Sequence, residues 1–150
     1  MTDVSIYHLT ATPLEKTLPK LMERVVDTGK RAVVLAASTD RVEELNHVLW
    51  TYSSNTFLPH GTKKDGFPEE QEIWLTSEWE NPNQASILVL TDGMESSDLE
   101  SFERCLDIFD GNNEIALQKA QSRIEKYVQK GHTLSYWCQT PAGKWEAKSL

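Results

Sequence analysis

Cysteine is scarce in this chain: Cys105 and Cys138 are its two, and neither has a partner at metal-ligand spacing. A disulfide framework is therefore excluded, and we predict that both are reduced structural thiols. No apolar run approaches the roughly 20 residues that cross a bilayer. The first residues also lack a basic segment followed by an apolar core, so we expect no membrane span, no secretory signal and a cytoplasmic location.

Glycine-rich loops and paired histidines are missing as well. No predicted strand is followed by the glycine spacing with which backbone amides approach a phosphate, and there is no P-loop lysine. None of the four histidines lies in a paired ligand motif, so we expect no metal site. Because no catalytic signature or cofactor motif emerges, we favour a binding function over a catalytic one. The alternative is a small nucleotide- or phosphate-using α/β enzyme, with a site near Asp92 and the loop 38–40.

The net charge of −8 disfavours a protein that wraps duplex DNA by itself, since that requires phosphate neutralisation by lysine and arginine. The charge is unevenly distributed. Residues 92–114 hold eight acidic residues and one basic residue, whereas residues 115–150 hold six basic and two acidic residues. The C-terminal part is thus a basic patch on an acidic protein. Such a patch can steer an acidic partner, or it can be an ordinary solvated helix face.

The length of 150 residues fits one domain, residues 1–150. Apolar periodicity predicts helices at 13–27, 41–51, 97–108 and 114–130 and strands at 4–9, 31–37, 73–76 and 87–91. Residues 133–138 and 144–147 flank a turn and predict a hairpin. The long polar stretch 52–71 is predicted to be a loop. Loops of this length are uncommon in a compact domain, which suggests that it has a function. The order of elements predicts an α/β sandwich: a largely parallel sheet with helices on both faces and a C-terminal β-hairpin.

Two surfaces carry candidate binding residues. On the predicted last helix, Lys119, Arg123, Lys126 and Lys130 recur at helical spacing beside an apolar face formed by Leu117, Ala120, Ile124, Tyr127 and Val128. Cations beside apolar surface suit an acidic peptide with a hydrophobic end. We expect this stripe to be exposed, so that Arg123→Glu leaves the melting temperature nearly unchanged. Ordinary packing of the helix remains the alternative.

The second surface contains large apolar groups in a polar, looping stretch: Leu49, Trp50 and Tyr52, followed by Phe57, Leu58, Pro59 and His60. Aromatic residues there could anchor a protein interface, with ordinary packing again as the alternative. Direct binding of single-stranded DNA through these aromatics requires nearby cations. The nearest are Lys63 and Lys64, and acidic residues lie close to them, which makes this third function weak.

Several segments resemble the chi subunit family of bacterial DNA polymerase III, in the same order and over nearly the whole chain. They are LNHVLWTYS (45–53), TFLPHG (56–61), IWLT (73–76), DIFDGN (107–112), GHTLSYW (131–137) and GKWE (143–146).

The resemblance implies a Rossmann-like three-layer sandwich and a noncatalytic accessory subunit of the clamp-loader assembly. It implies two partners: the psi subunit, and the acidic C-terminal tail of single-stranded DNA-binding protein. DNA would be contacted mainly indirectly. The family's psi-facing region falls on Trp50, Phe57, Leu58 and Pro59. Its tail-binding helix falls on Arg123, Tyr127 and Lys130, to which the charge stripe adds Lys119 and Lys126.

This chain departs from the family pattern within that helix. Family members commonly have an aromatic residue followed by lysine after the arginine at position 123, whereas this chain has Ile124 and Glu125. Some members also have arginine where this chain has Gln121. We therefore expect the tail to bind more weakly, or to be shifted onto Lys119, Lys126 and Lys130.

Overall fold

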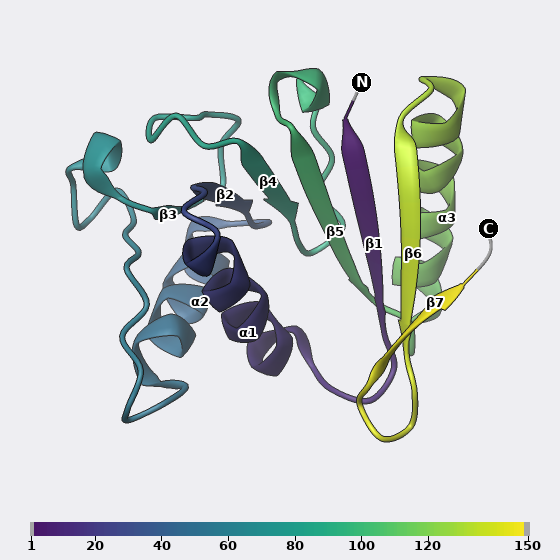
Figure 1. The fold of residues 1–150 in the computed structure, drawn as a ribbon, viewed down its shortest axis with the longest axis horizontal. Helices are drawn as coiled ribbons and strands as arrows, with labels where there is room; N and C mark the ends of the chain where they lie inside the picture. Colours follow the sequence, from purple (N-terminus) through teal and green to yellow (C-terminus); the bar gives the residue numbers. More distant parts are fainter. Residues whose placement is uncertain (1, 149–150) are drawn as a thin grey trace.

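One seven-stranded sheet organises the structure, a computed structural model that describes residues 2–148 (Figure 1). The strands follow the order β3-β2-β4-β5-β1-β6-β7. Every neighbouring pair is parallel except β6 and β7, which form an antiparallel hairpin. The predicted largely parallel sheet with a C-terminal hairpin is thus confirmed. The strands are β1 (Asp3–Leu9), β2 (Ala32–Leu35), β3 (Ile73–Thr76), β4 (Ile87–Leu90), β5 (Arg104–Asp110), β6 (Thr133–Gln139) and β7 (Trp145–Lys148).

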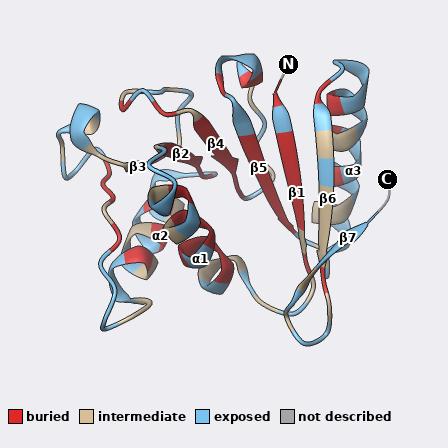
Figure 2. Ribbon diagram, viewed as in Figure 1, coloured by how far each residue is buried: buried red, intermediate tan, exposed pale blue. Residues whose placement is uncertain are grey.

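Helices cover both faces of this sheet. α1 (Leu14–Asp27) and α2 (Thr39–Thr51) pack on one face through Leu18, Met22 and Leu45, whereas α3 (Glu114–Gln129) packs on the other through Ala120 and Tyr127. Figure 2 shows the buried residues concentrated in the central strands and exposed residues along the edge strand β7. The result is a three-layer α/β sandwich of the Rossmann-like type, as predicted.

Local sequence explains most of these elements. β2 and β4 are continuous apolar runs, AVVL and ILVL, because a parallel strand between two helical layers is buried on both faces. Two helices begin at side-chain caps. Ser38 Oγ accepts a hydrogen bond from the Arg41 amide at 3.1 Å, and Asn113 Oδ1 accepts one from the Ala116 amide at 3.0 Å. The predicted loop 52–71 contains only the 3₁₀ turn Pro68–Glu70.

The predicted helix 97–108 is wrong. The chain makes a 3₁₀ turn at Leu99–Ser101 and then enters strand β5. Ser96 Oγ accepts a hydrogen bond from the Asp98 amide, and the Asp98 carbonyl accepts one from the Ser101 hydroxyl, so these polar residues close a turn rather than cap a helix. Within β5, the buried Asp107 interrupts the apolar alternation and disguises the strand.

The connections of the sheet reverse direction between β1 and β5. From β1 the chain passes through α1 toward β2, and from the adjacent β5 it passes through α3 toward β6 on the other side. Such a switch point opens a crevice at the carboxyl ends of the strands, where ligands of open α/β sheets bind. Within residues 2–148, no helix has both the length and the apolar character needed to cross a membrane.

Candidate protein-binding surfaces

A cleft of about 600 Å³ lies at this switch point, and we call it the strand-end cleft. The ends of β1, β4 and β5 and the first turns of α1 and α3 line it. Arg41, Lys119 and Arg123 supply its positive charge, and Glu15, Asp92 and Asp110 supply its negative charge. A groove therefore exists beside Arg123, as binding of a tail peptide there requires.

Arg123 itself is not the exposed cation that its spacing predicts; that expectation is wrong. The residue is 2% exposed, and its Nε and Nη2 donate to the two carboxylate oxygens of Asp107 at 2.8 and 2.9 Å. Tyr127 is also buried, and its hydroxyl donates to the same carboxylate at 2.7 Å. Burial lowers the pKa of Arg123, but the bidentate pairing with Asp107 outweighs it and raises the pKa above the ordinary value. Together Arg123, Tyr127 and Asp107 form a buried polar cluster between α3 and β5.

The other three cations, Lys119 and Lys126 of α3 and Lys130 directly after it, are exposed, as predicted. Lys126 Nζ contacts Glu95 at 3.0 Å, and the side chain of Lys119 lies beside Gly93, so these lysines face the loop that follows β4. Ile124 and Val128 each lie two residues from Lys126 in the sequence. On an α-helix this spacing turns their side chains about 200° away from that of Lys126. Val128 is exposed on the side away from the lysines. Ile124 and Val128 thus do not share a surface with the lysines, whereas Ile115 and Ala116 in the first turn of α3 line the strand-end cleft together with Lys119.

Asp92, on which the alternative enzymatic hypothesis depends, has a structural role in the loops around it. Its carboxylate accepts a hydrogen bond from the Ala37 amide at 3.2 Å and pairs with Arg41 Nε at 3.1 Å. Arg41 also contacts Glu15 and Glu44. Asp92 therefore joins the ends of β2 and β4, and Ser38 of the same hypothesis is occupied as the cap of α2.

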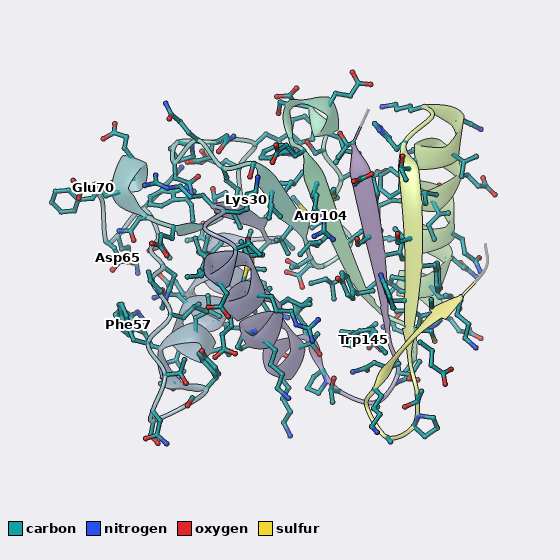
Figure 3. All side chains as sticks on the ribbon, in the orientation of Figure 1. Lys30, Phe57, Asp65, Glu70, Arg104 and Trp145 are labelled. Atoms are coloured by element: carbon teal, nitrogen blue, oxygen red, sulfur yellow. The ribbon has the colours of Figure 1, made fainter. Side chains whose placement is uncertain are left out.

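The second predicted surface is partly exposed. Trp50 is 52% exposed and Phe57 69% exposed, and their ring centroids lie 5.7 Å apart. The His60 ring packs against Trp50 at 4.8 Å. Leu58 is buried in the core beneath this surface and Pro59 is half-buried, so among the four predicted residues Trp50 and Phe57 present the accessible area. Figure 3 shows Phe57 projecting outward from the loop beyond α2.

Lys63 and Lys64, the two lysines that follow these aromatics in the sequence, are both in ion pairs. Lys63 Nζ contacts Glu78 at 2.6 Å and Glu80 at 3.5 Å, and Lys64 pairs with Glu43. This local neutralisation removes the phosphate-binding charge that a single-stranded DNA site would need beside Trp50 and Phe57.

A third feature was missed by the sequence interpretation. The exposed cations Lys16, Lys20 and Arg24 recur every four residues along α1 and face a second hollow of about 680 Å³, which we call the hairpin groove. Trp145 of β7 and Tyr52 at the end of α2 line the same groove. The spacing of the cations was visible in the sequence, but Trp145 on the opposite wall lies more than 100 positions away from them.

Burial shifts the pKa of two further groups, His8 and Cys105. His8 Nδ1 lies 2.7 Å from the Tyr136 hydroxyl, and burial lowers the pKa of His8 below its ordinary value. Cys105 is fully buried, which raises the pKa of its thiol well above the ordinary value. Among residues 2–148, no three His, Cys, Asp or Glu side chains gather closely enough to hold a metal ion.

The topology and the strand-end cleft define an open-sheet α/β protein of the Rossmann-like class. Residues 1–135 match the family described as DNA polymerase III chi subunit, HolC. A relative from Rickettsia prowazekii (strain Madrid E), named probable DNA polymerase III subunit chi, is 30% identical over 150 residues, covering 97% of this chain and 91% of its own length. The chain belongs to the DNA polymerase III chi subunit family, which confirms the resemblance found in its motifs.

Proposed function

We propose that the chain is a noncatalytic accessory subunit that links two partners at the replication fork, in the bacterial cytoplasm. One partner is the psi subunit of the clamp-loader assembly, and the other is the acidic C-terminal tail of single-stranded DNA-binding protein. Family membership supports the polymerase context. The observation that carries a binding role is the exposed aromatic pair Trp50 and Phe57, which the interior of this chain leaves uncovered.

The aromatic pair is the docking surface for psi in this proposal. Large aromatic side chains at the centre of an interface commonly dominate its binding energy. Trp50 packs against the buried His60 and against Phe57, so its ring is held against the body of the protein before a partner arrives. Such preorganisation reduces the entropy lost on binding.

Isothermal titration calorimetry with purified psi tests this surface. Truncation of a binding hot spot costs at least about 2 kcal/mol, so Trp50→Ala and Phe57→Ala should each weaken binding by about thirtyfold. Phe67→Ala is the matched control, because Phe67 is 70% exposed in a different part of the loop. Equal affinity of Trp50→Ala, Phe57→Ala and the control variant would refute the assignment.

The tail of single-stranded DNA-binding protein occupies the strand-end cleft in this proposal. Lys119 is exposed at its rim, and Ile115 and Ala116 offer apolar contact to a hydrophobic peptide end. Lys126 and Lys130 extend the positive surface along α3. Each exposed ion pair contributes only about 0.2–1 kcal/mol, so apolar burial in the cleft must supply much of the affinity. Added salt should therefore weaken binding without abolishing it.

A charge reversal on α3 tests the tail site. Lys119→Glu should weaken binding of a tail peptide severalfold, and Lys119→Glu/Lys126→Glu/Lys130→Glu should weaken it further. Lys30→Glu is the control, because Lys30 is an exposed cation at the opposite end of the sheet. Unchanged peptide affinity in the triple variant would exclude these lysines.

A further inference from the structure

The hairpin groove contains uncompensated positive charge on an acidic protein. Lys16, Lys20 and Arg24 form no ion pair among the described residues, although the chain carries a net charge of −8. Two carboxylates also line the groove: Glu15 pairs with Arg41, and Glu23 accepts a hydrogen bond from the Tyr52 hydroxyl at 2.8 Å, so the three cations outnumber the acidic groups of the lining. The three cations therefore present their charge to solvent along one wall.

On the opposite side of the hairpin groove lies the aromatic side chain of Trp145, which is packed against the core. Trp145 is half-buried and packs edge-on against Tyr7, with ring centroids 5.1 Å apart. In Figure 3, Trp145 lies between the hairpin and α1. The buried Gln139 fixes the floor, because its side-chain oxygen accepts hydrogen bonds from the amides of residues 10, 11 and 12 while its nitrogen donates to Thr12 Oγ1. The groove is thus built before any ligand enters.

We propose that the hairpin groove binds a short, extended acidic peptide of a partner protein, with carboxylates along the α1 cations and an aromatic residue on Trp145. The spacing supports an extended chain. Cations four residues apart on a helix are separated by about 6 Å along its axis. Alternate side chains of an extended peptide, which share one face, are about 6.6 Å apart. Acidic residues at every second position of the peptide therefore match the three cations.

A peptide fits this groove better than a nucleic acid strand. A volume of about 680 Å³ accommodates only a few residues. A longer polyanion would extend over a protein whose net charge is −8 and would be repelled. The groove touches the strand-end cleft at Thr12 and Glu15, but its cations come from α1 and not from α3.

The experiment uses the full chain and a fluorescein-labelled probe of sequence Asp-Gly-Asp-Gly-Asp-Phe, with binding followed by fluorescence anisotropy. Lys16→Glu/Lys20→Glu/Arg24→Glu should weaken probe binding at least tenfold. Lys30→Glu/Lys63→Glu/Lys64→Glu is the matched control, because it makes the same change in net charge at exposed cations that line neither the hairpin groove nor the strand-end cleft. It should weaken probe binding less than twofold. Melting temperatures of both variants verify folding.

A second variant tests the aromatic wall. Trp145→Leu keeps an apolar group against Tyr7 but removes the indole ring, and should weaken probe binding three- to fivefold. The proposal is overturned if the wild-type protein does not bind the probe at 1 mM, or if both triple variants lose affinity equally. It is also overturned if a ten-residue oligodeoxythymidine binds more tightly and is lost with the α1 cations. The psi and tail assays on Trp50, Phe57 and the α3 lysines report separately on the proposed function.

Discussion

Replacing Arg123 with methionine should destabilise the protein strongly, although its position in the sequence suggested a dispensable surface charge. The substitution retains a long apolar side chain but leaves the Asp107 carboxylate buried with only the Tyr127 hydroxyl as its partner. Removing one member of a buried ion pair costs about 3–5 kcal/mol, because the remaining charge stays desolvated. In a chain of this size each kcal/mol shifts the melting temperature by about 2–4 °C. The expected loss is therefore roughly 6–20 °C.

Compensating substitutions separate the charge effect from packing. In Asp107→Leu/Arg123→Met/Tyr127→Phe, no buried charge and no orphaned hydroxyl remains, and the whole cluster becomes apolar. Replacement of a buried ion pair by packed apolar residues is often neutral or stabilising. We expect this triple variant to recover most of the stability that Arg123→Met loses. Urea unfolding followed by circular dichroism measures the free energies of unfolding on one scale.

Two results would refute this reasoning. One is an Arg123→Met variant that unfolds at the wild-type urea concentration, since the buried pair would then contribute nothing. The other is a triple variant no more stable than Arg123→Met, since the loss would then come from packing. The same logic corrects the expectation for Arg123→Glu. That change places a second carboxylate beside Asp107 inside the protein, so it should lower the melting temperature and cannot serve as a selective probe of tail binding.

Three further outcomes follow from particular contacts. Because the pKa of His8 is lowered in the folded protein, the unfolded chain binds a proton at this residue more readily. The contribution of His8 to stability is therefore complete above a pH of about 6.5 and falls as the pH decreases. In thermal melts from pH 7 to 5, the melting temperature of His8→Gln should fall less than that of the wild-type protein. Gly111→Ala should cost about 1–3 kcal/mol in urea unfolding, because the added methyl would lie 2.8 Å from the Leu9 carbonyl oxygen and would overlap the His8 ring. Mass spectrometry after brief iodoacetamide treatment of the native protein should find Cys138 modified and the buried Cys105 untouched, and equal labelling would contradict this burial.

Most of the fold was predictable because apolar runs and turn residues report directly on buried parallel strands. β2 and β4 are recognised from four consecutive apolar residues each. β5 was not, because Asp107 interrupts its apolar pattern, and its burial depends on an arginine sixteen residues later. A long-range ion pair leaves no periodic signal in either segment.

The candidate sites were less predictable than the fold, because they too depend on contacts between residues far apart in the sequence. Positions 119, 123, 126 and 130 span about 60° of a helix, so spacing cannot tell which one turns inward. Arg123 is the one closest to the sheet. Trp50 and Phe57 are exposed, but Leu58 beside them belongs to the core. The hairpin groove needed the tertiary structure, since α1 and Trp145 meet only after folding.

The central position of β1 determines when this protein can fold. β1 occupies residues 3–9, yet its two neighbours in the sheet are β5, beginning at residue 104, and β6, beginning at residue 133. During synthesis, β1 therefore waits with both backbone edges unpaired until residues 104–138 have left the ribosome. Formation of the sheet should be slow, because contacts this distant in sequence close large loops. The nascent chain is most exposed to misassociation in that interval, through a strand that in the finished molecule has no free edge.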